Sequence, residues 1–322
     1  MTNDQHSVDG HADLVVAVDV GGTGMAAEVL DRERTTHASA TAATPRGDGA
    51  ATTRAVVALI EKALSGLPSS ARPAVRGIGL AIPGLVDTAR GLALYSANVG
   101  WHNTPVRDQV QAALGLPVVL QHDVTAAGEA ESRFGAGRGV SDLLVVVIGT
   151  GIAAVIIGGN RVVHGGAGQA GELGHVVVRP DGPLCGCGQR GCLEALASAS
   201  GIARSYTTST GRAVAGAADV WARLGRDAAA DRVWQDAISA LADGVLAACT
   251  LLAPDLVVFG GGLAEAGQDL LAPVHQRITE RARVASVPSF ARTELGRRAG
   301  LIGAAANARD HWNSAGTSTS TT

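Results

Sequence analysis

The sequence predicts an α/β protein of two domains that arose by internal duplication. The chain has 322 residues, enough for two domains with separate cores. Apolar runs of strand length alternate with segments of helical periodicity, which favours a mostly parallel sheet in each half. Residues 22–30 and 149–157 are identical at five of nine aligned positions, and each segment follows an apolar run. This repeat indicates two related halves, each opening with a strand, a glycine turn and a second strand.

The first half begins with an apolar strand over residues 14–18, which ends at Asp19 and enters the turn Gly21-Gly22-Thr23. The repeat predicts that residues 25–30 return as a second strand. Apolar runs and helical spacing predict the remaining elements of this half: strands over 77–82 and 116–120, and helices over 50–66 and 125–132.

The second half opens with an apolar strand over residues 143–148, which enters the turn Gly149-Thr150-Gly151. Helical segments are expected over 191–206 and 231–252. A strand over 256–259 then ends in Gly260-Gly261-Gly262, and a last helix is expected over 303–311.

The composition excludes several classes of protein. A hydrophobic fraction of 46% with 17% charged residues is typical of a globular chain and excludes a wholly disordered one. A net charge of −3 gives no basic surface for nucleic acid or an anionic membrane. Residues 1–12 are polar, unlike a signal peptide, and the apolar runs are too short to span a membrane. We therefore expect a soluble, cytoplasmic protein.

A cysteine cluster gives the most specific signal. Cys185, Cys187 and Cys192 lie within eight residues, and His175 lies ten residues before the first of them. A Cys-x-Cys pair bridges poorly and a reducing cytosol disfavours disulfides, so three thiolates and one imidazole predict a closed, structural Zn²⁺ site. The alternative is a coincidental group of free thiols. The remaining cysteine, Cys249, is expected to be a small buried hydrophobe.

The glycine turns at 21–24, 149–151 and 260–262 each follow an apolar strand. Backbone N–H groups of such turns can approach phosphate oxygens, because no side chain stands in the way. None of the turns matches the P-loop pattern. The alternative for each is a hairpin turn that needs a positive φ.

Asp123 is the candidate general base. It follows a predicted buried strand, at the place where α/β sheets position ligand-handling groups. The alternative is an ordinary helix N-cap. Glu172, His175 and Glu194 lie on or beside the metal loop and suit a polyhydroxylated ligand, although Glu172 alone would be interpreted as a solvated surface charge.

These motifs together resemble the ROK family (repressors, open reading frames and kinases) of the sugar kinase/actin superfamily. The resemblance extends from about residue 14 to about residue 310. The matching segments are Asp19-Val-Gly-Gly-Thr23, Gly149-Thr150-Gly151, Glu172-Leu-Gly-His175, Cys185-x-Cys187-Gly-x-x-Gly-Cys192-x-Glu194, and Pro254–Gly262.

The resemblance implies a two-domain actin/hexokinase-like (RNase H-like) fold around a cleft, and ATP-dependent phosphorylation of the C6 hydroxyl of a glucose-type hexose. Asp123 would be the general base, with Mg²⁺ near Asp19. The ATP phosphates would be held by Gly21, Gly22, Thr23, Gly149, Thr150 and Gly151, with Gly260, Gly261 and Gly262 near the adenosine. The sugar would be contacted by Gly84, Asn98, His122, Asp123, Glu172, His175 and Glu194. His175 would bind zinc through one nitrogen and the sugar through the other.

The resemblance also implies a homodimer and a division of the chain. Residues 13–122 with about 300–312 would form a small domain, and 123–299 a large domain with the zinc loop 175–192. Residues 1–12 and the Ser/Thr-rich tail 313–322 are expected to be disordered. Repressor members carry an N-terminal winged helix, whereas the first glycine turn begins here at residue 21, so no nucleic-acid partner is expected.

Three positions depart from the family pattern. His122 stands where the family has Asn, Thr125 where Asn is usual, and Gly24 where Lys is usual. A neutral imidazole offers one donor and one acceptor, and the acceptor could take a hydrogen bond from an ammonium group on the sugar. The expected substrate is therefore either glucose or an aminodeoxyglucose such as kanosamine or glucosamine. The alternatives are a non-catalytic sugar-sensing protein and a kinase for an N-acetylated hexosamine.

Overall fold

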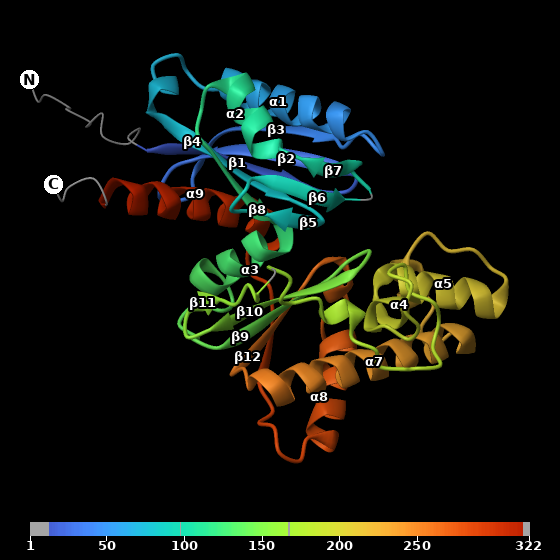
Figure 1. The fold of residues 1–322 in the computed structure, drawn as a ribbon. Helices are drawn as coiled ribbons and strands as arrows, with labels where there is room; N and C mark the ends of the chain where they lie inside the picture. The colour runs from blue at the N-terminus through green and yellow to red at the C-terminus, as the bar shows by residue number, and fades with distance from the viewer. Residues whose placement is uncertain (1–12, 97, 167, 318–322) are drawn as a thin grey trace, which may run out of the picture. The chain divides into compact units, whose positions relative to one another are not determined.

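In the computed structural model, residues 13–96, 98–166 and 168–317 are described (Figure 1). The chain divides into two compact units. Unit 1 takes in the chain up to Ala130 together with the part from Arg297 onward, and unit 2 takes in Glu131–Gly296. Each unit is described by itself.

Unit 1 is built on a mixed sheet with the strand order β3-β2-β1-β4-β8. β1 pairs with β2, and β2 with β3, in antiparallel fashion, whereas β1 and β4, and β4 and β8, are parallel. The strands are β1 (Leu14–Val20), β2 (Gly24–Leu30), β3 (Thr36–Ala43), β4 (Val75–Ile82) and β8 (Val118–His122). A smaller antiparallel sheet contains β5 (Leu85–Asp87), β6 (Leu92–Ser96) and β7 (Trp101–Thr104).

Helices cover both faces of the unit 1 sheet, which explains why residues 14–18 of β1 are all apolar. Val16 and Val18 of β1 belong to the core shared with α1 (Gly49–Ser65) and α2 (Val106–Leu114). Val15 and Ala17 belong to the core shared with α9 (Ala299–Thr317) and the start of α3 (Asp123–Phe134). Alternate residues of one strand therefore serve two separate cores.

Unit 2 repeats the same topology. Its sheet has the order β11-β10-β9-β12-β13, with the first two pairings antiparallel and the last two parallel. The strands are β9 (Leu143–Ile148), β10 (Ile152–Gly158), β11 (Arg161–Val162), β12 (Leu256–Gly260) and β13 (Ser289–Arg292). The two sheets have the same number of strands in the same order of antiparallel and parallel pairings, which confirms the duplicated halves.

The expectation of mostly parallel sheets is wrong. Each half opens with strands joined by short connections, such as the glycine turns after β1 and β9. Such turns can join only antiparallel neighbours, because a parallel pairing needs a crossover of a dozen residues or more. Parallel pairing therefore begins only where a helix intervenes.

Helix α7 (Ala228–Leu252) is the main helix of the unit 2 core. Within the described part of the chain it is the helix whose length and composition would allow it to cross a membrane. Trp234, Leu241 and Val245 are instead buried in the unit 2 core, so packing accounts for its apolar composition. The other helices of this unit are α4 (Leu193–Ala197), α5 (Ala199–Thr210), α6 (Ala217–Trp221) and α8 (Gln268–Arg281).

The expectation of a single helix over 191–206 is wrong, because this segment is divided into α4 and α5 at Ser198. This residue is extended (φ −72°, ψ 163°), and its hydroxyl accepts a hydrogen bond from the Gly201 backbone N–H at 3.0 Å. A serine in this position is a favourable N-cap, so a new helix begins there.

The two compact units divide at residues 130/131 and 296/297, and the domain limits predicted from the sequence, 122/123 and about 299/300, stay a prediction. The first turns of α3 stay with unit 1 because Ala126 packs among Leu301, Ala304 and Ala305 of α9. The tail expected to be disordered from residue 313 instead continues α9 to Thr317. Helical hydrogen bonding propagates from the packed part of α9 into this polar segment without an apolar face. Residues 1–12 and 318–322, also expected to be disordered, lie outside the described residues.

Glu131 is a fully buried carboxylate that holds three backbone N–H groups of unit 2. It accepts hydrogen bonds from Ala136 (3.1 Å), Glu294 (3.1 Å) and Leu295 (2.8 Å). Glu131→Ala leaves these donors without their partner, so we expect a loss of about 3 kcal/mol or more in the free energy of unfolding. Urea unfolding measures this change. Glu294→Ala, at an exposed side chain of the same segment, is the control; equal stabilities would contradict the role of Glu131.

Candidate functional site

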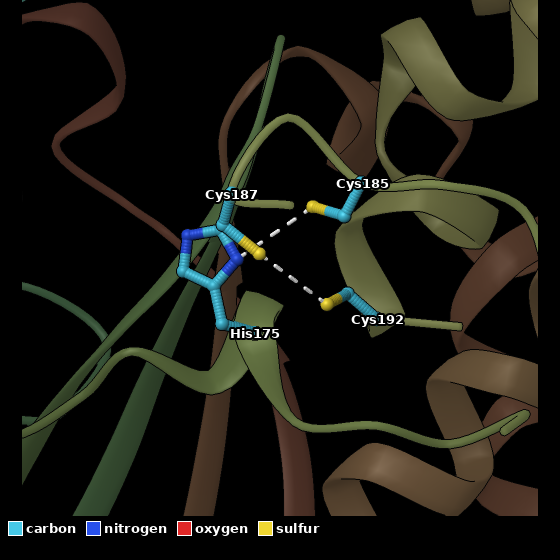
Figure 2. Close-up of side chains that lie close together, drawn as sticks. All are labelled: His175, Cys185, Cys187 and Cys192. Atoms are coloured by element: carbon cyan, nitrogen blue, oxygen red, sulfur yellow. Dashed lines mark hydrogen bonds between the residues drawn. The ribbon is translucent and has the colours of Figure 1, made fainter. Parts of the chain in front are cut away.

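His175, Cys185, Cys187 and Cys192 come together in unit 2, as the sequence predicts. One ligand atom of each lies within 4.8 Å of the others (Figure 2). The Sγ atoms of Cys187 and Cys192 are 3.7 Å apart, and His175 Nδ1 is 3.7 Å from Cys185 Sγ. Ligands at zinc bond lengths in a tetrahedron would be about 3.6–3.8 Å apart. All four cysteines of the chain are free thiols. The geometry fits one small metal ion better than a disulfide, and Cys249 is buried away from this group, as expected.

Glycine backbones shape the metal loop. Gly191 has a φ of +70°, and a Cβ atom on it would lie 1.4 Å from the carbonyl oxygen of Arg179. The two residues are joined through the backbone, since Arg179 N donates to Gly191 O at 3.2 Å. Any side chain at position 191 would therefore force the loop open and move Cys192, its neighbour.

Arg179 anchors the same loop to α7 and is a site residue that the sequence analysis misses. Its guanidinium donates to Asp243 at 2.5 Å and to Ser239 at 3.2 Å. Asp243 also pairs with Arg281 of α8. A charged residue paired across 64 positions gives no local signal in the sequence, because it is indistinguishable there from a solvated surface charge.

The imidazole of His175 faces two ways. Nδ1 points toward the thiol of Cys185, and Nε2 lies 3.9 Å from Oε2 of Glu172. Glu172 is the N-cap of the short 3₁₀ helix η3 (Leu173–His175), and His175 is its last residue. Glu172 has a side chain that is 51% exposed, so its carboxylate is open to a ligand. One nitrogen is therefore available for a metal while the other belongs to a polar surface group, as the expected double role requires.

The side chain of Glu194, at the start of α4, packs against the end of the second glycine turn. Its Oε2 accepts a hydrogen bond from the backbone N–H of Ile152 at 3.0 Å. The turn itself is closed by a hydrogen bond from Gly149 N to Gly151 O at 2.9 Å. The metal loop and the predicted phosphate turn thus meet at one carboxylate.

The first glycine turn is held by Thr44, whose hydroxyl donates to Gly21 O at 2.7 Å and whose N–H donates to Thr23 O at 3.2 Å. A Cβ on Gly22 would lie 3.7 Å from the side chain of Asn98, so the structure brings these two predicted site residues together. Gly22 and Gly149 have no positive φ. A hairpin requirement therefore does not explain either glycine, and both leave room beside their backbone.

Gly84 and Gly261 are glycines for a structural reason. Gly84 has a φ of +100° and Gly261 a φ of +82°. A Cβ would lie 2.2 Å from Tyr95 O in the first case and 2.4 Å from Ile148 O in the second. Backbone conformation and close packing account for both residues, so their contacts with sugar and adenosine stay predictions.

Asp123 is the first residue of α3, directly after β8. Its Oδ1 accepts a hydrogen bond from Val124 N at 2.7 Å and lies 3.3 Å from His122 Nε2. Burial raises the pKa of Asp123 to about 6. Removal of the carboxylate from water disfavours its charged form, which is the condition of a carboxylate that can exchange a proton near neutral pH.

Asp19 is the last residue but one of β1, at the same edge of the sheet. Asp19 is paired with Ala81 of β4, and Ala81 with Gln121 of β8, so parallel register places Asp19 and Asp123 near one another. Burial, and next the charge of Asp123, raise the pKa of Asp19 to about 7. A carboxylate whose ionisation is disfavoured by a second carboxylate nearby is a favourable place for a divalent cation, whose charge offsets both.

Comparisons with known proteins agree with these features. The family model described as "ROK family" matches residues 15–311. A glucokinase of Streptomyces coelicolor is 33% identical over 322 residues, covering 92% of this chain and 98% of that protein.

Solved structures give the same answer. A ROK hexokinase from Thermus thermophilus superposes with a TM-score of 0.82 at 32% identity, covering 94% of this chain and 99% of that one. A ROK family glucokinase from Streptomyces griseus, solved in complex with glucose and AMPPNP, gives a TM-score of 0.77 at 31% identity, covering 92% and 99%. The expected two-domain hexokinase-like fold is thereby confirmed. Because the family model spans nearly the whole chain, this protein belongs to the ROK family.

Proposed function

We propose that this protein transfers the γ-phosphoryl group of ATP to the C6 hydroxyl of a glucose-type hexose, in the cytoplasm. The observation that carries the proposal is Asp123, a partly buried carboxylate directly after the carboxyl end of the parallel strand β8, with a pKa raised to about 6. The family and the glucokinases similar to this chain support sugar phosphorylation.

Asp123 acts as the general base in this proposal. It accepts the proton of the sugar hydroxyl while that oxygen forms a bond to the γ-phosphorus and the bond from phosphorus to ADP breaks. A carboxylate with the ordinary pKa of an aspartate would be a weaker proton acceptor, so burial is what suits Asp123 to this step.

Glycine turns and metal ions complete the proposed site. Gly21, Gly22 and Thr23, with Gly149, Thr150 and Gly151, would offer backbone N–H groups to the phosphates. The Asp19 carboxylate fits Mg²⁺, which would neutralise phosphate charge when bound. The Cys₃His group fits Zn²⁺, which would fix the loop that carries His175 and precedes Glu194. Gly260–Gly262 near the adenosine and a homodimeric assembly belong to the same proposal.

The experiment that tests this function is an ADP-release assay with ATP and a panel of sugars. The panel contains glucose, mannose, glucosamine, kanosamine, N-acetylglucosamine and N-acetylmannosamine. Turnover of glucose or an aminodeoxyglucose supports the proposal. Turnover of N-acetylated sugars alone would identify an N-acetylhexosamine kinase, and binding of a sugar without ADP release would identify a non-catalytic sensor.

His122 is proposed to set the choice between glucose and an aminodeoxyglucose. A neutral imidazole can accept a hydrogen bond from an ammonium group, whereas the family's amide suits hydroxyls. The preference is measured as the ratio of kcat/KM for kanosamine or glucosamine to kcat/KM for glucose. We expect His122→Asn to shift this ratio toward glucose by an amount that corresponds to about 1–3 kcal/mol.

The pH dependence of this ratio provides the control. Asp123 serves both sugars, so its titration cancels from the ratio at each pH. Protonation of His122 at low pH should remove the advantage of the aminohexose, because two cations repel in a poorly solvated site. An equal ratio in the wild type and His122→Asn would show that His122 does not determine specificity, and glucose would be the better substrate assignment.

A further inference from the structure

We propose that Glu194 is a positioning residue that couples the sugar-binding group of unit 2 to the phosphate-binding turn at 149–151. This role rests on the proposed function and adds to it a second task for Glu194 besides contact with the sugar. All the residues involved lie within unit 2.

The carboxylate of Glu194 is attached to the end of the turn. Its Oε2 accepts the backbone N–H of Ile152 at 3.0 Å, and Ile152 is the residue that follows Gly151 and begins β10. Its Oε1 faces the other way, 4.0 Å from Cys185 Sγ in the metal loop. Glu194 therefore spans the distance between the metal loop and the turn.

Gly151 is explained by this carboxylate. Its backbone has no positive φ, so conformation alone would admit a side chain. A Cβ there would lie 2.4 Å from Glu194 Oε2 and 3.2 Å from its Cδ, so the carboxylate occupies that place. At Gly149, two residues earlier, a Cβ would have no described atom within 4 Å. The two glycines of one turn therefore have different surroundings.

Two further contacts connect the turn with the sugar-binding group. The carbonyl of Gly149 accepts a hydrogen bond from Ala199 N at 2.9 Å, five residues beyond Glu194. A Cβ on Gly174 would lie 2.2 Å from Ile152 O, so the η3 turn between Glu172 and His175 packs on the same residue whose N–H is bound by Glu194. A displacement of Glu194 would therefore disturb both groups.

The two glycines provide a matched pair of variants. In Gly151→Ala the new methyl group displaces Glu194, so we expect the dissociation constant for glucose, or for whichever panel sugar is turned over, to rise about tenfold, although residue 151 belongs to the phosphate turn. The constant for the ATP analogue AMPPNP should rise as well. Gly149→Ala should weaken AMPPNP binding alone. Calorimetry measures each constant with the other ligand absent, and zinc content confirms that the metal loop is intact.

Two further variants separate coupling from general damage. Glu172→Gln should weaken sugar binding and leave AMPPNP binding unchanged, because Glu172 lies on the sugar side of His175 and not in the turn at 149–151. In a Glu194→Asp background the shorter side chain makes room for the methyl group. Gly151→Ala should therefore raise the dissociation constant for the sugar by a clearly smaller factor than in the wild type.

Equal sugar affinities of Gly151→Ala and Gly149→Ala, or additive effects in the Glu194→Asp background, would overturn the coupling while leaving the proposed function intact. A wild-type protein that binds neither AMPPNP nor any sugar of the panel would overturn the proposed function and this role with it.

Discussion

Asp123→Asn should lower kcat by about 10²-fold or more while the KM for the sugar changes far less. The amide keeps the size of the carboxylate and can still accept the Val124 N–H, so the start of α3 should be preserved. What is lost is the ability to take up the hydroxyl proton as the sugar oxygen attacks phosphorus. Steady-state kinetics with the best sugar of the panel measure both constants.

Glu129→Gln is the matched control, since it makes the same chemical change on the same helix. Glu129 accepts a hydrogen bond from Gln121, which an amide oxygen can also accept. This variant should keep kcat within a few-fold. If Asp123→Asn turned over sugar as fast as this control, Asp123 would be only a helix-terminal residue and another base would be needed.

The pH profile gives an independent measurement of the same role. The base must be ionised to act, and burial raises the pKa of Asp123 to about 6 from its ordinary value of 3.8. At saturating Mg²⁺, which would keep Asp19 ionised, activity should therefore be constant above about pH 7 and fall about tenfold per pH unit well below pH 6. In Asp123→Asn this fall should disappear from the residual activity. A wild-type profile that stays flat down to pH 4 would contradict the assignment.

The elements that the sequence predicts best are those buried on both sides. β9 is apolar throughout, and most residues of β1 and β4 are apolar or glycine and buried, so these strands stand out without an alignment. β3 gives no strand signal in the sequence, because its eight residues are Thr, His, Ser and Ala with mostly exposed side chains. α8 gives no clear helix signal either, because it is polar on average and contains Pro273.

The candidate site shows the same distinction. The metal ligands lie within 18 residues of one another, from His175 to Cys192, so their spacing alone predicts the cluster. Asp19 and Asp123 lie far apart in sequence, but a general rule of α/β sheets places the carboxyl ends of parallel strands together. No such rule predicts the Arg179–Asp243 pair or the Glu194–Ile152 hydrogen bond, because each depends on how loops pack against elements distant in the chain.

Loss of the metal ion from the Cys₃His group is the second change for which we expect a large effect, on both sugar affinity and thermal stability. We expect purified protein to contain about one zinc ion per chain and Cys187→Ser to lose it, together with sugar affinity and roughly 10 °C of thermal stability. Cys187 is an exposed ligand, so a serine there creates no cavity in a core, and the loss would report on the metal. Metal analysis, calorimetry and thermal unfolding measure the three quantities.

The pH dependence and a second variant make this prediction specific to zinc binding. Burial raises the pKa of the Cys192 thiol to about 12, so an ion must displace its proton, and zinc affinity should increase with pH. Cys249→Ala changes the cysteine outside the cluster and should keep the full zinc content even if removal of a buried thiol costs some stability. If chelator-treated protein free of zinc retained full activity and thermal stability, the four residues would be a chance group of thiols. If metal and sugar affinity were lost together, the loop that carries His175 and holds Glu194 at the phosphate turn would depend on the ion for its shape.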